Sequence, residues 1–207
     1  MKNNTMLRAK RWTKYLISYI YERLHGLDFS MAYAGKLQMD SEEFNGYCMT
    51  DTKDMMRMLR AVPIDPSRAT FLDVGCGKGM CLKCAVEIGY QKVAGLELDP
   101  HLAAIARKNM EKLKMDAECI CSDAVDFSSY ADYDVFYFYN PFGEFILEKV
   151  IQKIKDSQKR RNRQIWIIYY HPVFGALFDR AGFVLKSEVG DTTRNMTTRV
   201  YCYPKRS

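Results

Sequence analysis

The stretch that decides the fold is Thr70-Phe-Leu-Asp-Val-Gly-Cys-Gly-Lys-Gly79, where a short β-rich run meets three closely spaced glycines. The run 70–74 predicts a buried strand, and a helical pattern follows the glycines directly. Glycines allow a sharp turn and a close approach to a ligand, and a helix start offers N–H groups that lack partners within the helix. The spacing differs from the dinucleotide fingerprint G-x-G-x-x-G, because Met80 replaces its third glycine. An NAD-dependent oxidoreductase is therefore disfavoured.

Strand and helix patterns alternate from residue 69 onward. The expected strands are 70–74, 92–97, 117–121, 133–139 and 164–170, and the expected helices are 78–88, 100–113, 143–155 and 172–181. Runs without polar alternation, such as 134–139, are typical of central parallel strands. The chain then carries two strands, 183–189 and 196–203, with no helix between them. We therefore expect an α/β fold: a doubly wound, mostly parallel seven-stranded sheet with an antiparallel C-terminal strand.

The first third of the chain has a different texture, with helical patterns and no β-rich run. Apolar residues recur at three- and four-residue spacing over 12–27, which predicts an amphipathic helix packed on the body of the protein. A second helical pattern, 51–62, stops before Pro63. The interpretation is an N-terminal helical extension over residues 1–66, followed by one α/β domain over residues 67–207.

The composition excludes several classes of protein. The chain has 207 residues, a mass of 24.1 kDa and 48% hydrophobic residues, enough for one domain with a substantial core. No apolar run approaches the ~18–20 residues of a membrane-spanning helix, and the polar, basic start is unlike a secretory signal. The seven cysteines are an odd, scattered set, which favours buried thiols in a reducing, cytoplasmic compartment. The spacings of Cys81/Cys84 and Cys119/Cys121 fit a helix and a strand, so we expect core cysteines and no metal.

Basic charge is concentrated in two stretches, although the net charge of the whole chain is only +6. Residues 1–23 carry six basic side chains against one acid, and residues 149–163 carry seven against one. Such patches could meet RNA or an acidic lipid surface. We favour two solvated helix faces, because no aromatic-interleaved nucleic-acid motif accompanies the charge. A nucleic-acid partner is possible but is not favoured.

Acidic residues lie at the ends of three successive predicted strands: Asp73, Glu97 and Asp123. Asp73 would repel a pyrophosphate but attract a ligand that carries an ammonium or sulfonium group. Glu97 stands about 20 residues after the first glycine, where a carboxylate can bind both hydroxyls of a ribose. Leu98 then offers an apolar face for a purine, and Asp123 offers an acceptor for an exocyclic amino group. Each acid alone could be a helix cap, but three around a glycine loop favour one ligand site.

Three segments, Phe71–Gly79, Ala94–Asp99 and Ser122–Ala124, resemble the first three motifs of class I (seven-strand, Rossmann-like) S-adenosylmethionine-dependent methyltransferases. The resemblance extends over residues 70–203 and includes the terminal reversed hairpin. It implies a methyltransferase whose cofactor is S-adenosyl-L-methionine. The residues that it assigns to the cofactor are Asp73 with Gly75, Cys76, Gly77 and Gly79 for the methionine part, Glu97 for the ribose, Leu98 for the adenine ring, and Asp123 with the Ala124 N–H for the adenine edge.

Two further segments resemble parts of the same family. Asn140-Pro-Phe-Gly143 resembles the Asn/Asp-Pro-Pro-aromatic tetrad of amine-directed members, with one proline where those have two. This implies catalytic roles for Asn140, Pro141 and Phe142: an amide oxygen and a backbone carbonyl accept hydrogen bonds from the target nitrogen, and the aromatic ring packs on the substrate. Asn140 would also border the cofactor. Tyr47-Cys-Met-Thr50 resembles the Tyr-x-x-Thr/Ser segment of seven-strand protein-lysine methyltransferases, which implies that Thr50 closes over the cofactor, although Thr50 could equally be an N-cap.

The methyl acceptor is left open by these motifs. His171 follows the predicted strand 164–170, so it could take a proton from a hydroxyl acceptor, or it could simply order the turn before Pro172. An amine needs only to arrive unprotonated, and we favour an amine nitrogen of a protein or small molecule. The alternatives are an O-methyltransferase of a small metabolite or glycan, and a non-catalytic cofactor-binding module whose basic helices hold RNA or a protein. Residues 1–66 are expected to cover the acceptor site.

Overall fold

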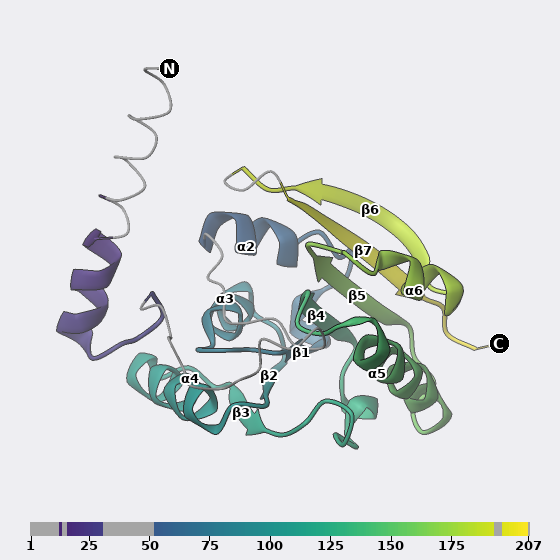
Figure 1. Cartoon of the computed structure of the whole chain (residues 1–207), viewed down its shortest axis with the longest axis horizontal. Helices are drawn as coiled ribbons and strands as arrows, with labels where there is room; N and C mark the ends of the chain where they lie inside the picture. The colour runs from purple at the N-terminus through teal and green to yellow at the C-terminus, as the bar shows by residue number, and fades with distance from the viewer. Residues whose placement is uncertain (1–12, 14–15, 31–51, 193–195, 207) are drawn as a thin grey trace.

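The computed structural model describes residues 13, 16–30, 52–192 and 196–206, in which a mixed sheet lies between two layers of helices (Figure 1). The strands are β1 (Thr70–Val74), β2 (Lys92–Glu97), β3 (Glu118–Cys121), β4 (Val135–Tyr139), β5 (Ile165–Tyr170), β6 (Val184–Gly190) and β7 (Thr197–Tyr203). The α-helices are α2 (Thr52–Leu59), α3 (Met80–Ile88), α4 (Pro100–Leu113), α5 (Glu144–Asp156) and α6 (Gly175–Arg180). Short 3-10 helices are η1 (Pro66–Arg68), η2 (Tyr130–Asp132) and η3 (Ser157–Lys159), and residues 16–25 are also helical.

The seven strands lie in the order β3-β2-β1-β4-β5-β7-β6. Parallel pairs join β1 to β2 and β4, β2 to β3, and β4 to β5. β7 is antiparallel to both of its neighbours, β5 and β6. The predicted doubly wound, mostly parallel sheet with an antiparallel C-terminal strand is confirmed. Strand order reverses between β1 and β4, and the segments that follow the parallel strands meet at one edge there, where ligands bind in open α/β sheets.

The core divides into two layers because alternate strand residues face opposite sides of the sheet. In β5, Trp166, Ile168 and Tyr170 belong to the layer under α2, α3 and α4, whereas Ile165, Ile167 and Tyr169 belong to the layer under α5 and α6. Both faces of the central strands are therefore buried, which explains the continuous apolar runs in the sequence. Figure 1 shows α2 and α3 on one side of the sheet and α5 on the other.

The amphipathic helix predicted over residues 12–27 forms in part, but its apolar side chains do not pack on the body of the protein as expected. Residues 16–25 are helical, as expected, but Leu16, Ile20 and Leu24 are 55%, 49% and 79% exposed, so the expected packing of this face is wrong. The contact with the body is made instead by the following turn, because Leu27 and Phe29 are buried in the layer that also contains α2. None of the helices within the described ranges combines the length and apolarity needed to cross a membrane.

Candidate functional site

The glycine loop after β1 adopts a backbone that only glycine takes easily. Gly75, Gly77 and Gly79 have φ angles of +89°, +53° and +86°, in the left-handed region. The N–H groups of Gly75 and Cys76 both donate to the carbonyl oxygen of Leu96, at 2.9 and 2.8 Å, and this ties the loop to β2. The buried Cys76 side chain fills the space that a Cβ would need at Gly95, whose ideal Cβ would lie 2.6 Å from the Cys76 Cβ.

Glu97 at the end of β2 is joined to the glycine loop. Its Oε2 accepts from the N–H of Gly77 at 2.8 Å, and its Oε1 accepts from the N–H of Asp99 at 3.0 Å. Burial raises the pKa of Glu97, and the hydrogen bonds from Asp99 and Gly77 oppose that rise. Each carboxylate oxygen can accept a further hydrogen bond, such as one from a ribose hydroxyl. Leu98 is half-buried beside it.

Asp73, the last residue but one of β1 and two residues before Gly75, is almost fully buried. Burial raises the pKa of Asp73 to about 8; the Cys81 side chain opposes the rise and Glu97 adds to it. Among the described residues, neither Asp73 nor Glu97 has an ion-pair partner. Two desolvated carboxyl groups without a cation fit a ligand that brings its own positive charge, as S-adenosylmethionine does.

Asp123 and Ala124 lie just beyond β3. Cys121 pairs with Glu97 across the β2–β3 register, so Asp123 follows two residues after that pair at the same sheet edge. Asp123 Oδ1 accepts from the N–H of Val125 at 2.7 Å, which fixes a local turn. Ala124 is buried, and its carbonyl oxygen accepts from the Tyr130 hydroxyl at 2.7 Å. The structure therefore brings the ends of β1, β2 and β3 together around the glycine loop.

Asn140 stands at the turn after β4 with a φ angle of +39°. Its amide Oδ1 accepts from the hydroxyl of Tyr169 at 2.7 Å, and both side chains are buried. Pro141 packs against the glycine loop, because an ideal Cβ on Gly75 would lie 2.9 Å from the Pro141 Cβ. Phe142 is only 8% exposed and belongs to the core layer under α5, so its ring supports the turn from below.

Of the other two residues that the sequence suggested, the structure describes only His171, and no hydrogen bond or ion pair of the described residues joins its side chain to this group. His171 has a φ angle of +52° and an exposed side chain. Its described hydrogen bonds are made by the backbone: the N–H donates to Thr197 at 3.0 Å, and the carbonyl oxygen accepts from Val173 at 2.8 Å. Thr50 lies outside the described residues, so its role stays a prediction.

Two features of the site were missed in the sequence. Tyr169 orients Asn140, and the β4–β5 register, which pairs Phe138 with Tyr169, is the signal that could have found it. Lys78, inside the glycine loop, is 1% exposed, and its ammonium lies 2.6 Å from a carboxylate oxygen of Asp28. No local sequence pattern could have predicted that Lys78 pairs with Asp28, fifty residues earlier in the chain. Within the described ranges, no cluster of three or more His, Cys, Asp or Glu side chains could hold a metal ion.

Comparison with known proteins places this geometry among methyltransferases. A family model described as "Methyltransferase domain" matches residues 71–160. A ribosomal protein L11 methyltransferase of Geobacter metallireducens is 38% identical over 55 residues, which cover 27% of this chain and 18% of that protein. The corresponding protein of Vibrio campbellii is 37% identical over 49 residues, 24% of this chain and 17% of that protein. This chain therefore matches less than a fifth of the length of these curated relatives.

Solved structures share the fold over most of the chain. An RNA methyltransferase from Salinibacter ruber, crystallised with S-adenosyl-L-homocysteine, aligns with a TM-score of 0.57 at 18% identity, covering 77% of this chain and 96% of that chain. A SAM-dependent methyltransferase from Aquifex aeolicus aligns with a TM-score of 0.52 at 13% identity, covering 74% and 99%. At such identities the likeness is one of fold.

Proposed function

Since this chain belongs to the class I, seven-strand S-adenosylmethionine-dependent methyltransferases, we propose that it transfers a methyl group to an amine nitrogen of a protein or small molecule. The curated relatives are named for a ribosomal protein and one structural neighbour for RNA, so the names of similar proteins leave the kind of acceptor open. The choice of a nitrogen rests on the residues at the end of β4.

We assign the cofactor to the edge formed by β1, β2 and β3. Asp73 and the loop Gly75–Gly79, including Cys76, would hold the methionine part, and Glu97 would bind the ribose hydroxyls. Leu98, Asp123 and the Ala124 N–H would hold the adenine. When bound, S-adenosylmethionine supplies an activated methyl group together with its own leaving group. The buried carboxyl group of Asp73 and the half-buried one of Glu97, neither with an ion-pair partner among the described residues, are the observation that supports this fit.

The acceptor's nitrogen would be held by Asn140. An amide oxygen accepts hydrogen bonds but cannot remove a proton, so it suits an amine that arrives unprotonated and needs only to be aimed. Tyr169 fixes the direction of that oxygen by donating its hydroxyl hydrogen to it. Placement alone can contribute up to about 7–11 kcal/mol to a reaction between two held groups, so no strong base is required.

One observation carries the proposal: the turn that holds Asn140 contacts the glycine loop directly, through Pro141 against Gly75. An acceptor hydrogen-bonded to Asn140 is therefore next to the loop assigned to the cofactor. His171, in contrast, presents an exposed side chain and contributes backbone hydrogen bonds to its turn.

Calorimetry with S-adenosylmethionine and S-adenosylhomocysteine tests the cofactor, and transfer of radiolabelled methyl groups into fractionated lysate tests the reaction. We expect both cofactors to bind and Asn140→Ala to abolish transfer, with His171→Ala still active. Loss of transfer in His171→Ala alone would identify a hydroxyl acceptor instead. Cofactor binding without transfer into any fraction would favour the non-catalytic module.

A further inference from the structure

The helix over residues 16–25 exposes a group of large apolar side chains, which we name the apolar face. Its five members are between 49% and 79% exposed: Leu16, Ile17, Ile20, Tyr21 and Leu24. In the described part of the chain nine large hydrophobic side chains are exposed, so more than half of them lie on this one short helix. Single apolar side chains are ordinary on a protein surface, but a contiguous group of them marks a contact surface.

The apolar face is directed away from the body of the protein. With 3.6 residues per turn, its five members fall within an arc of about 140° around the helix. Glu22 lies on the opposite side of the helix and is only 7% exposed. Its Oε2 accepts from the N–H groups of Phe29 and Ser30 at 2.9 and 2.8 Å. The helix is thus held by its polar side, at the edge of the molecule (Figure 1).

The turn after the helix keeps this orientation. Leu27 and Phe29 are buried in the core layer that contains α2 and α3. The N–H of Asp28 donates to Asn109 Oδ1 of α4 at 2.9 Å, and its carboxylate pairs with Lys78. Because the turn is joined to the core in this way, the fold itself presents the apolar face to the surroundings.

The charge that accompanies the apolar face is basic. Glu22 is the one acid among residues 1–23, and its carboxylate is occupied by the contacts above. The same stretch contains six basic residues: Lys2, Arg8, Lys10, Arg11, Lys14 and Arg23. Arg23 lies on the described helix and is exposed. At the end of the helix, Lys112 of α4 places its Nζ 3.7 Å from an ideal Cβ on Gly26. The exposed surface of the helix over residues 16–25 therefore carries no acid.

An anionic bilayer surface matches both properties. The apolar face of such a helix enters the boundary between headgroups and acyl chains, and each Lys or Arg near anionic lipid strengthens binding about fivefold. A second copy of this chain would match the apolar face, but it would bring together two stretches in which six basic residues face one acid. An RNA chain would match the charge but would leave the five apolar side chains in water.

We propose that the helix over residues 16–25 docks this protein on an anionic lipid surface. The apolar face enters the outer layer of the lipid, and the basic residues lie against the headgroups. The helix would lie along the surface, as amphipathic helices of this composition do. This inference concerns where the protein works, and it does not depend on the acceptor proposed above.

The apolar part of the proposal is tested by sedimentation of the full chain with vesicles. The vesicles consist of phosphatidylcholine alone or of phosphatidylcholine with about one-third phosphatidylglycerol. The variant is Ile17→Gln/Leu24→Gln. The matched control, Phe145→Gln/Val173→Gln, removes two apolar side chains that are 57% and 56% exposed elsewhere on the protein. We expect the variant to lose binding to the anionic vesicles about tenfold or more, and the control to bind like the wild type.

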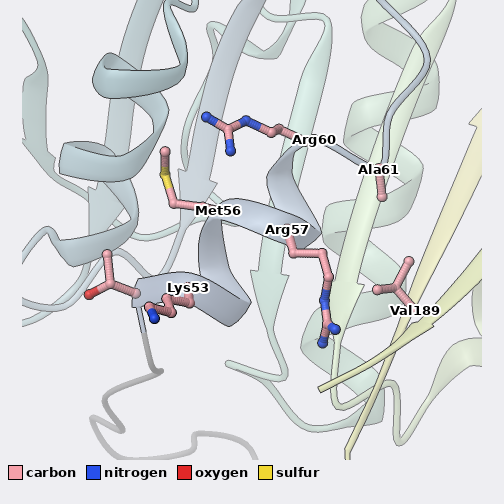
Figure 2. A pocket seen from close by; sticks show the side chains of 7 residues that line it. Lys53, Met56, Arg57, Arg60, Ala61 and Val189 are labelled. Atoms are coloured by element: carbon pink, nitrogen blue, oxygen red, sulfur yellow. The ribbon is translucent and has the colours of Figure 1, made fainter. Parts of the chain in front are cut away.

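The part played by charge is tested by Arg23→Gln. This change should weaken binding to the anionic vesicles about fivefold and leave the weak binding to phosphatidylcholine unchanged. Its control is Arg60→Gln, which removes an exposed arginine of α2 that lines a hollow of about 680 Å³ beside that helix (Figure 2). We expect Arg60→Gln to bind like the wild type. Circular dichroism checks that every variant is folded, as expected for changes at exposed positions.

Several results would overturn the inference. A wild type that does not bind the anionic vesicles, or that binds both kinds of vesicle equally, would contradict it, as would equal losses in the variant and its control. Light scattering without lipid measures self-association: a wild-type dimer that Ile17→Gln/Leu24→Gln dissociates would assign the apolar face to a second copy. Tight binding of a short oligouridylate in place of vesicles would assign the basic charge to RNA.

Discussion

The fold buries the carboxyl group of Asp73, and this burial disfavours its ionised form. Asp73 is 2% exposed, and burial raises its pKa to about 8. At neutral pH Asp73 is therefore largely protonated, and a cation placed beside it would favour the ionised form. If Asp73 holds the cofactor as we propose, proton release from Asp73 would accompany the binding of positive charge.

We predict that the affinity for S-adenosylmethionine rises about tenfold from pH 6 to pH 7. Below a pKa of about 8, the ionised fraction of Asp73 grows tenfold with each pH unit, and the cofactor binds this form. Calorimetry at the two pH values measures the change. Asp73→Asn should bind weakly at both, with no such dependence, and a wild type indifferent to pH would contradict the role given to Asp73.

Tyr169 is a positioning residue for Asn140, and its own pKa is raised to about 12 by burial, so it stays a hydrogen-bond donor. Tyr169→Phe should lower the rate of methyl transfer about tenfold, the worth of one hydrogen bond of about 1.4 kcal/mol, and leave cofactor affinity unchanged. Initial rates and calorimetry separate the two quantities. Tyr90→Phe, which removes a buried hydroxyl bonded to Leu59 at 3.3 Å, is the matched control and should keep full activity.

At the scale of elements, the glycine loop depends on β2 as much as on its own sequence. Cys76 occupies the space above Gly95, and its N–H is bonded to Leu96. A methyl group at position 95 would meet the Cys76 Cβ at 2.6 Å and its sulfur at 2.7 Å, so the loop would have to move.

We predict that Gly95→Ala lowers the affinity for S-adenosylhomocysteine at least tenfold and the free energy of unfolding by about 1–3 kcal/mol. Gly190→Ala, at the end of β6, meets nothing within 4 Å and should change the free energy of unfolding by less than about 0.5 kcal/mol. Calorimetry and urea unfolding measure both variants. Similar behaviour of the two would show that the loop tolerates displacement.

The elements themselves were predictable because their signals are local. The strand 70–74 and the helix 100–113 were expected with the bounds that the structure has, since a β-rich run and an N-terminal proline mark them. The helix after the glycine loop begins at Met80 instead of residue 78, because Gly77 and Gly79 stay left-handed. The strand expected from residue 133 begins at Val135, after the η2 turn.

At the scale of the whole molecule, the turn over residues 26–30 is bonded to the glycine loop and to α4. Lys78 forms its ion pair with Asp28, and Asn109 Nδ2 of α4 donates to the carbonyl oxygens of both residues at 2.9 Å. The turn is fixed internally by Glu22, whose Oε2 accepts from the N–H groups of Phe29 and Ser30. Three distant parts of the chain thus meet behind the loop.

We predict a coupling energy of about 1–3 kcal/mol between Asp28→Asn and Lys78→Met in a double-mutant cycle of unfolding. Asp156 and Lys159 form an ion pair with the same 2.6 Å separation, but its side chains are 44% and 63% exposed. The cycle through Asp156→Asn and Lys159→Met should therefore give less than about 1 kcal/mol. A coupling no larger in the Lys78–Asp28 pair, in which the lysine is buried and the aspartate half-buried, would mean that this ion pair adds little to the stability of the fold.

Features that depend on how distant parts of the chain are placed could not be predicted from local sequence patterns. The sequence contains basic runs at 1–23 and 149–163, whereas Lys53, Arg57 and Arg60 are separated by turns of a helix and form no run. The exposure of Leu24 depends on where the helix over residues 16–25 lies relative to the sheet. Asn140 and its motif were found from the sequence, but the burial of Phe142 follows from the layer beneath it.

The contact between Pro141 and Gly75 has a consequence for how this protein could diversify. A methyl group on Gly75 would not fit against Pro141, so the turn that carries Asn140 and the glycine loop are in direct contact. A change that reshapes that turn for a new substrate would shift the neighbouring loop as well. Substrate choice and cofactor retention would then evolve as linked traits, with tolerated variation directed toward more distant surfaces.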